Sequence, residues 1–120
     1  MNILIVDDNE TNRKLLRVNL EAEGYDTLEA ADGVEALSVL AREQVDVVFS
    51  DIVMPGEMNG IDLAEEVARR WPRIKILLTS GFPEAAIGRS NTRPTAQILS
   101  KPYRTEDLGR AIFELLERPE

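Results

Sequence analysis

Short apolar runs alternate with segments of helical period along the whole chain. Runs at residues 3–6, 45–49 and 74–78 are typical of strands buried on both faces of a parallel sheet, and residues 25–29 and 96–99 predict two weaker strands. A regular alternation of strand and helix favours right-handed crossovers that place helices on both faces of the sheet. The pattern therefore predicts a doubly wound α/β fold, with a five-stranded parallel sheet between two layers of helices.

Apolar residues recur at helical spacing between these strands. Four helices are predicted: one at about residues 10–23, one opened by the capping pair Asp32 and Glu35, one that ends before Pro72, and one capped by Thr105. The inward faces predicted for them comprise Leu16, Leu20, Val34, Leu37, Leu40, Ala41, Ala64, Val67, Ala68, Trp71, Leu108, Ile112, Leu115 and Leu116.

Residue types that the chain lacks exclude several kinds of chemistry. The sequence contains no Cys and no His. Disulfides, thiolate nucleophiles, thiol zinc sites, Ser–His catalysis and histidine metal ligands are therefore excluded. Chemistry in this chain must come from carboxylates, hydroxyls, Lys or Arg, together with a hard cation that takes oxygen ligands.

Charge and hydropathy limit the partners and the compartment. The chain has 14 basic and 22 acidic residues, for a net charge of −8, which argues against binding to nucleic acid. No apolar run approaches the roughly 18 residues that span a bilayer, so neither a transmembrane segment nor a membrane partner is expected. No signal peptide is recognised. We expect a single cytoplasmic domain formed by residues 1–120.

Polar side chains follow four of the five predicted strands, at the point where each strand ends. They are Asp7, Asp8, Asp51, Thr79, Ser80 and Lys101. In an open parallel sheet the carboxyl ends of the strands form the edge where ligands bind. A single Asp in such a place is commonly a turn or cap residue. Three carboxylates packed together, however, repel one another unless a cation compensates, and an all-oxygen set of ligands indicates Mg²⁺.

Four fragments at these strand ends stand in a fixed order along the chain. They read IVDD at residues 5–8, VFSDIVMP at 48–55, LTSG at 78–81 and SKPY at 100–103. Together they resemble the receiver domain of response regulators in two-component signalling. The loop at residues 55–60, which is one residue longer than in many receivers, is similar to that of receivers in hybrid kinases and of their stand-alone relatives. The resemblance covers essentially the whole chain. It implies a flavodoxin-like strand order of 2-1-3-4-5.

The resemblance also implies a role for each carboxylate. Asp51 would be the nucleophile that accepts a phosphoryl group from a phosphohistidine, carried by a sensor histidine kinase or a histidine phosphotransfer protein. Asp8, Asp51 and the backbone carbonyl of Val53 would hold Mg²⁺, for which Mn²⁺ can substitute. Asp7 would act on the ion through a water molecule.

Lys101 and a hydroxyl complete the implied site. Lys101 would pair with the phosphoryl oxygens, and Ser80 would be the hydroxyl that responds to them. Ser80 is favoured over Thr79 because the family has a small residue directly after this hydroxyl, and Gly81 follows Ser80. The phosphoryl group adds charge and acceptor oxygens that can draw this loop inward and change partner binding. The chain is thus predicted to be a signalling switch and not a metabolic enzyme.

Three departures from the usual receiver pattern lead to separate expectations. Ile98 stands three positions before Lys101, where many receivers have an aromatic residue, and only a short helix is predicted at residues 83–89. We therefore expect partner docking, or a homodimer, through another surface such as the first and last helices. Val53, two positions after Asp51, offers no polar group to orient water, which predicts slow loss of the phosphoryl group.

Other functions were weighed against this interpretation. A small Mg²⁺-dependent phosphohydrolase would need a second Asp two residues after Asp51, where Val53 stands. An interaction module that works without phosphorylation would not need the complete acid set and Lys101. A flavodoxin-like cofactor binder would need a phosphate-binding loop after the first strand, where Asp7 and Asp8 would repel phosphate.

Overall fold

The computed structural model describes residues 1–52, 58–80, 97–100 and 103–117. Five parallel strands form one sheet in the order β2-β1-β3-β4-β5, so the predicted order 2-1-3-4-5 is confirmed. The strands are β1 (Asn2–Val6), β2 (Asp26–Ala30), β3 (Val47–Asp51), β4 (Lys75–Ser80) and β5 (Gln97–Ser100). Compared with the prediction, β3 begins two residues later and extends to Asp51.

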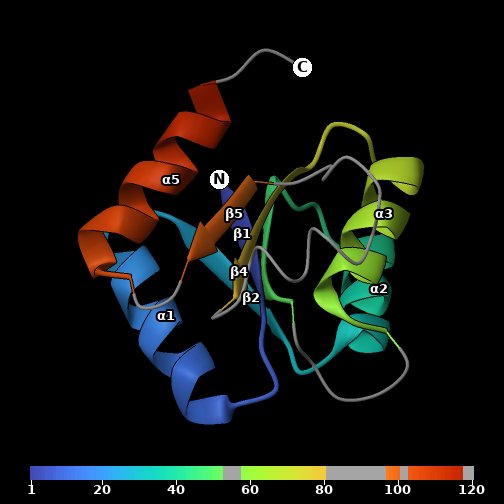
Figure 1. Cartoon of the computed structure of the whole chain (residues 1–120), viewed down its shortest axis with the longest axis horizontal. Coiled ribbons are helices and arrows are strands. Elements are labelled where there is room, and N and C mark those ends of the chain that lie inside the picture. Colours follow the sequence, from blue (N-terminus) through green and yellow to red (C-terminus); the bar gives the residue numbers. More distant parts are fainter. Residues whose placement is uncertain (53–57, 81–96, 101–102, 118–120) are drawn as a thin grey trace.

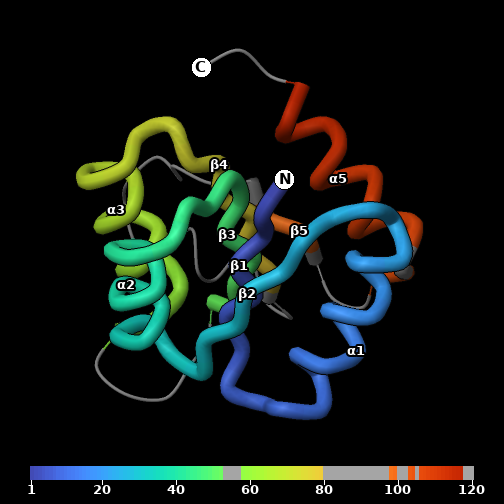
Figure 2. The backbone as a smooth tube through the Cα atoms, turned by 180° about the vertical axis from the view of Figure 1, so that it is seen from behind, coloured from blue at the N-terminus to red at the C-terminus, as the bar shows by residue number. Residues whose placement is uncertain are grey.

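Helices cover both faces of the sheet. The described helices are α1 (Glu10–Ala22), α2 (Gly33–Arg42), α3 (Gly60–Arg70) and α5 (Thr105–Glu117). Helices α2 and α3 lie on one face, and α1 and α5 lie on the other (Figures 1 and 2). This is the three-layer arrangement that the alternating pattern predicts. The short helix expected at residues 83–89 lies outside the described residues.

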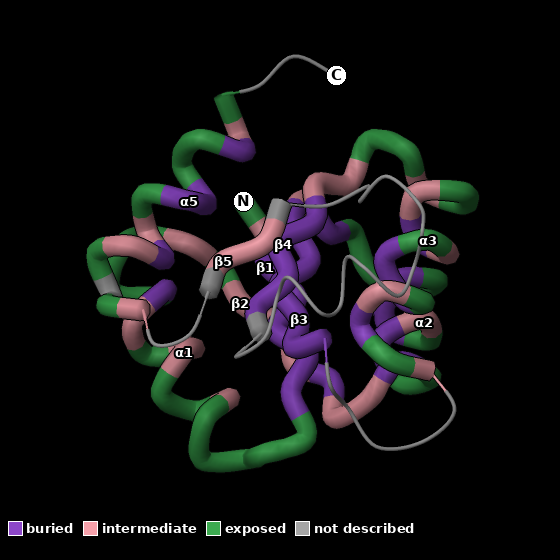
Figure 3. The backbone as a smooth tube through the Cα atoms, in the orientation of Figure 1, coloured by how far each residue is buried: buried purple, intermediate pink, exposed green. Residues whose placement is uncertain are grey.

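Two apolar cores fill the spaces between the sheet and its helix layers, and β1 contributes to both. Leu4 and Val6 pack toward α2 and α3, whereas Ile3 and Ile5 pack toward α1 and α5, because successive strand residues point to opposite faces. Figure 3 shows the buried strands at the centre of the molecule. Each fully buried Leu or Ile contributes about 1.5–3 kcal/mol relative to an exposed one. The continuous apolar runs are therefore explained by burial on both faces.

Helix α2 differs from its predicted inward face. The residues of α2 that are buried are Gly33, Ala36, Val39 and Leu40. Val34, with 71% of its surface exposed, and Ala41 point away from the sheet, so the prediction that both face inward is wrong. The reason is that the buried residues of α2 follow one another at a spacing of three or four, from Ala36 to Leu40. Val34 and Ala41 lie outside this spacing and therefore on other faces of the helix.

The predicted caps are confirmed in part. The Asp32 carboxylate accepts a hydrogen bond from the Glu35 N–H at 2.8 Å and caps α2 as expected, although the Glu35 side chain accepts from the Ala31 N–H. Thr105, predicted to cap the last helix, is instead the first residue of α5. The Arg104 N–H preceding it donates to the Asp107 carboxylate at 3.0 Å, so an acidic side chain from the first turn satisfies the start of this helix.

Candidate functional site

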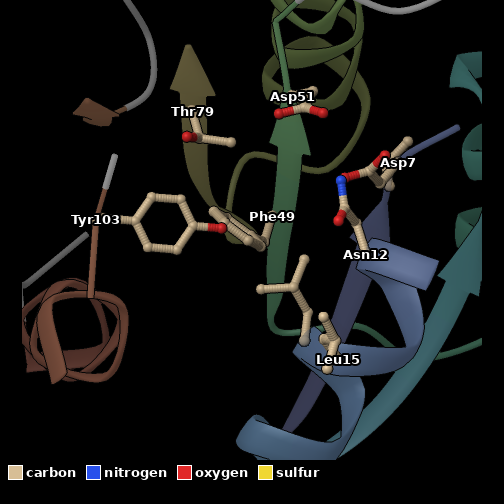
Figure 4. Close-up of a pocket in the computed structure, with 9 residues that line it drawn as sticks. Asp7, Asn12, Leu15, Phe49, Asp51, Thr79 and Tyr103 are labelled. Atoms are coloured by element: carbon tan, nitrogen blue, oxygen red, sulfur yellow. The ribbon is translucent and has the colours of Figure 1, made fainter. Parts of the chain in front are cut away.

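The register of the sheet brings the predicted carboxylates to one edge. Strands β1 and β3 pair in parallel with Val6 beside Ser50, and Asp51 on β3 stands beside Thr79 on β4. Asp7 and Asp8 follow β1 directly. Figure 4 shows Asp7, Asp51 and Thr79 at the ends of their three strands.

Three carboxylates form a compact acidic cluster at this edge. Asp7, Asp8 and Asp51 each present an oxygen, and these oxygens lie within 4.8 Å of one another. Asp7 and Asp51 are only 6% and 8% exposed, whereas Asp8 is exposed. An all-oxygen set of this kind, open on one side, suits a hard divalent cation that keeps some of its water.

The cluster changes the proton affinity of Asp7. Burial raises the pKa of the Asp7 carboxyl, and the neighbouring charges of Asp51 and Asp8 raise that pKa further. The Asn9 N–H, which donates to Asp7 Oδ1 at 2.8 Å, lowers the pKa and opposes these effects. Burial and the repulsion between these carboxylates both disfavour the charged form of Asp7 in the folded chain, and a bound cation would offset this cost in free energy.

A pocket of about 610 Å³ opens beside this acidic cluster. The residues that line it are Val6, Asp7, Asn12, Leu15, Leu16, Phe49, Asp51, Thr79 and Tyr103. The Tyr103 ring reaches into the pocket and packs edge-on against Phe49, with 6.2 Å between ring centroids (Figure 4). Burial and the charges of Asp51 and Asp7 raise the pKa of Tyr103 to about 12, so its hydroxyl stays protonated at neutral pH and can donate a hydrogen bond.

The backbone directly after Asp51 is fixed by hydrogen bonds and by close packing against the start of α3. The Ile52 N–H donates to the Thr79 carbonyl at 2.9 Å, and the Gly60 N–H donates to the Ile52 carbonyl at 2.7 Å. A Cβ at Gly60 would overlap the Asp51 carbonyl oxygen and lie 2.7 Å from the Ile52 Cα. Glycine is therefore required here, because α3 begins in contact with the end of β3.

The two hydroxyl residues at the end of β4 are Thr79 and Ser80. Thr79 is 4% exposed and lines the pocket, and its hydroxyl oxygen makes no hydrogen bond within the described part of the chain. Ser80 belongs to β4 and pairs with Ser100 through the backbone. The choice of Ser80 over Thr79 as the responsive hydroxyl stays a prediction. Val53 and Lys101 lie outside the described residues, and their roles also stay predictions.

Sequence reasoning missed the residues that support the acidic cluster. Arg13 on α1 donates to the Asp7 carbonyl at 2.7 Å and forms an ion pair with Glu29 at the end of β2, at 3.2 Å. Gly60 was also missed as a close contact of Asp51. Glu29 lies at the carboxyl end of β2, and each of the other four strands carries a predicted site residue at its carboxyl end. This position could have indicated that Glu29 contributes to the surroundings of the acidic cluster.

Within the residues that the structure describes, no helix combines the length and the apolar sequence required to cross a bilayer.

Comparison with known proteins gives consistent matches. A family model described as the response regulator receiver domain matches residues 3–113. The chain is 38% identical to sensor kinase CckA and 35% identical to the response regulator receiver protein CpdR, both of Brucella abortus (strain 2308), over 97% and 95% of its length. The solved structure of chemotaxis protein CheY4 of Vibrio cholerae has a TM-score of 0.80 and 28% identity, covering 95% of this chain and 97% of that one.

These relatives differ in how much of their own length is matched. The chain spans 12% of the length of CckA and 95% of that of CpdR. The similarity to CckA therefore concerns one part of a longer protein, whereas the similarity to CpdR extends over nearly all of it.

Proposed function

Because the chain belongs to the family of response regulator receiver domains, we propose that it works as a phosphoacceptor switch with Asp51 as the acceptor. The observation that carries this proposal is the position of Asp51. Its buried carboxylate ends the central strand β3 and lies within 4.8 Å of carboxylate oxygens of Asp7 and Asp8. A nucleophile so placed is reached through the pocket that Tyr103 and α1 border.

The proposed reaction moves a phosphoryl group from nitrogen to oxygen. A carboxylate oxygen of Asp51 attacks the phosphorus of a phosphohistidine, and an O–P bond forms as the P–N bond breaks. The electron pair of that bond leaves with the imidazole nitrogen, which takes up a proton. Water later attacks the phosphorus of the acyl phosphate, the bond between phosphorus and the Asp51 oxygen breaks, and inorganic phosphate leaves while Asp51 returns to its carboxylate form.

The acidic cluster fits a divalent cation, and we assign Mg²⁺ to it, with Mn²⁺ as a substitute. Asp8, Asp51 and the Val53 carbonyl would hold the ion, and Asp7 would act through a bound water. When bound, Mg²⁺ supplies positive charge that offsets the carboxylates and the charge on the transferring oxygens. Lys101 would add a second positive charge beside the phosphoryl group.

The proposed phosphodonor is a sensor histidine kinase or a histidine phosphotransfer protein. Apolar side chains on α1 and α5 support docking on this side of the molecule. Leu15 and Val18 on α1 are 59% and 54% exposed, and Phe113 on α5 is 56% exposed. A homodimer through α1 and α5 is the alternative use of the same surface.

Intact mass spectrometry tests the proposal. The protein is incubated with Mg²⁺ and phosphoramidate, a small phosphodonor, and one added phosphoryl group is expected. Asp51→Asn and a sample treated with chelator should gain none. Asp26→Asn is the matched control, since Asp26 is an exposed residue at the start of β2 and the same charge is removed. An addition that persists in Asp51→Asn would exclude Asp51 as the acceptor.

A further inference from the structure

Arg13 connects three elements around the acidic cluster. From the first half of α1, its Nη1 donates to the backbone carbonyl of Asp7 at 2.7 Å, and its Nε donates to Glu29 Oε1 at 3.2 Å. The other oxygen of Glu29 accepts from Arg17 Nη1, also at 3.2 Å. The ends of β1 and β2 are thus joined through one guanidinium group on α1.

The exposed fractions of the side chains show that Arg13 contacts Glu29 from the buried side and Arg17 from the solvent side. The Arg13 side chain is 16% exposed, compared with 30% for Glu29 and 40% for Arg17. A guanidinium is planar and presents its N–H groups in a rigid fork, so it can bond to a carboxylate and a carbonyl at once. Arg17 contacts Glu29 from the outer side and, among the residues that the structure describes, makes no hydrogen bond or ion pair with Asp7.

The carbonyl that Arg13 holds belongs to the peptide that joins Asp7 to Asp8. The Asp7 N–H donates to the Ala30 carbonyl at 3.1 Å, and Asp7 Oδ1 accepts from the Asn9 N–H at 2.8 Å. With the Arg13 contact, both backbone polar groups and one carboxylate oxygen of Asp7 are fixed. A rotation of this peptide would move the Asp8 carboxylate relative to Asp7, because Asp8 follows directly.

Partly exposed ion pairs contribute little to the free energy of unfolding, so stabilisation of the fold does not account for this network. Its contact falls on the one peptide whose orientation sets the relation between two carboxylates of the cluster. Groups that orient metal ligands from outside the ligand set commonly change metal affinity by about 10–100-fold when they are removed.

We propose that Arg13 is a positioning residue that fixes the peptide between Asp7 and Asp8 for cation binding, and that Glu29 fixes Arg13 in turn. This inference rests on the proposed function, because it assigns a support to the proposed Mg²⁺ site. It concerns the orientation of the carboxylates, and no step of the phosphoryl transfer passes through Arg13.

The sign of the effect separates positioning from charge. If Arg13 acted only through its positive charge, its removal would strengthen Mg²⁺ binding, since a charge that repels the cation would be gone. If Arg13 positions the peptide between Asp7 and Asp8, its removal weakens binding. Arg17→Met is the matched control, because it removes the same charge from the same ion-pair network and leaves the contact with Asp7 in place.

Isothermal titration with MgCl₂ in the absence of any phosphodonor measures the affinity directly. Arg13→Met is expected to raise the Mg²⁺ dissociation constant by about tenfold, whereas Arg17→Met leaves it unchanged or lowers it. Arg13→Lys keeps the charge and can donate to the Asp7 carbonyl, so it should recover part of the affinity. If Arg13→Met fails to fold by circular dichroism, Arg13→Lys against Arg17→Lys decides, with weaker binding expected only for the former.

The outcomes distinguish the two proposals. Wild-type protein that binds Mg²⁺, with Arg13→Met equal to it or tighter, would overturn the positioning role and leave the proposed function intact. Equal weakening by Arg13→Met and Arg17→Met would also overturn it, because the effect would then be a general loosening of α1. Wild-type protein that binds no Mg²⁺ would remove the metal site and this inference with it.

Discussion

Acidic residues at the two ends of the sheet have different surroundings and opposite effects on stability. At the amino end, Asp46 accepts a hydrogen bond from the Asn2 N–H at 2.8 Å, and its own N–H donates to the Asn2 carbonyl at 2.9 Å. At the carboxyl end, three carboxylates stand within 4.8 Å of one another, and burial and mutual repulsion raise the pKa of Asp7. The first arrangement stabilises the fold, and the second costs stability, which indicates that the second is retained for binding.

Addition of Mg²⁺ gives the largest expected difference between the two ends. A ligand that binds only the folded state adds about 2.7 kcal/mol to the free energy of unfolding at 100 times its dissociation constant. We expect this gain for the wild type in chemical denaturation. The gain should be lost in Asp8→Asn and kept in Asp46→Asn. Equal gains in all three proteins would show that Mg²⁺ binds elsewhere.

Gly60→Ala should damage the carboxyl end through packing alone. The new methyl group would overlap the Asp51 carbonyl oxygen, so the free energy of unfolding should fall by about 1–3 kcal/mol, the usual cost of overpacking. Gly109→Ala is the control within α5, where the new methyl group would meet only the flexible side chain of Glu23. That variant should be neutral or more stable in thermal melts, and a similar loss in both would contradict the argument from close contact.

Asp46→Ala should affect the amino end by a smaller amount. It removes the acceptor of the Asn2 N–H, and the loss of one such hydrogen bond costs about 1 kcal/mol. Urea denaturation without metal measures this loss. The Mg²⁺ dissociation constant should not change, because Asp46 lies at the opposite end of the sheet from Asp51. A change in that constant would mean that the two ends are coupled.

The smallest expected effect is a dependence of stability on pH that comes from Asp7. Its pKa in the folded protein is raised above the ordinary value of 3.8, so the folded state binds more protons than the unfolded state between these two values. The free energy of unfolding contributed by Asp7 therefore falls as the pH rises through this window. Asp7→Asn, which keeps an acceptor for the Asn9 N–H, should lack that fall in metal-free buffer. A pH profile identical to that of the wild type would contradict the raised pKa.

Much of the fold could be predicted because strands that are buried on both faces of a sheet consist mainly of apolar residues. The strands β1, β3 and β4 contain uninterrupted apolar runs at residues 3–6, 47–49 and 76–78, and their alternation with helical segments allows few topologies. The end of β3 was harder to predict. Ser50 and Asp51 are polar, so the apolar pattern stops at Phe49, yet pairing with β1 and β4 carries the strand to Asp51.

The carboxylates of the candidate site could be predicted from the sequence, but the residues that hold them in place could not. Asp7, Asp8 and Asp51 follow from a rule about strand ends, which needs only the order of the elements. Arg13 and Glu29 are 16 residues apart on different elements. Charged residues on a helix are usually solvated, and no local pattern marks the one whose guanidinium turns inward. The exposure of Val34 depends in the same way on the rotation of α2 against the sheet, which the local sequence leaves open.

The separation of the apolar interior into two compartments has a consequence for how substitutions combine. Leu40 packs in the compartment under α2 and α3, and Leu108 packs in the one under α5, with the sheet between them. Residues without shared packing partners contribute independently to the free energy of unfolding. Substitutions in one helical layer should therefore combine additively with substitutions in the other, and the strands β1, β3 and β4, which contribute residues to both compartments, form the border between them.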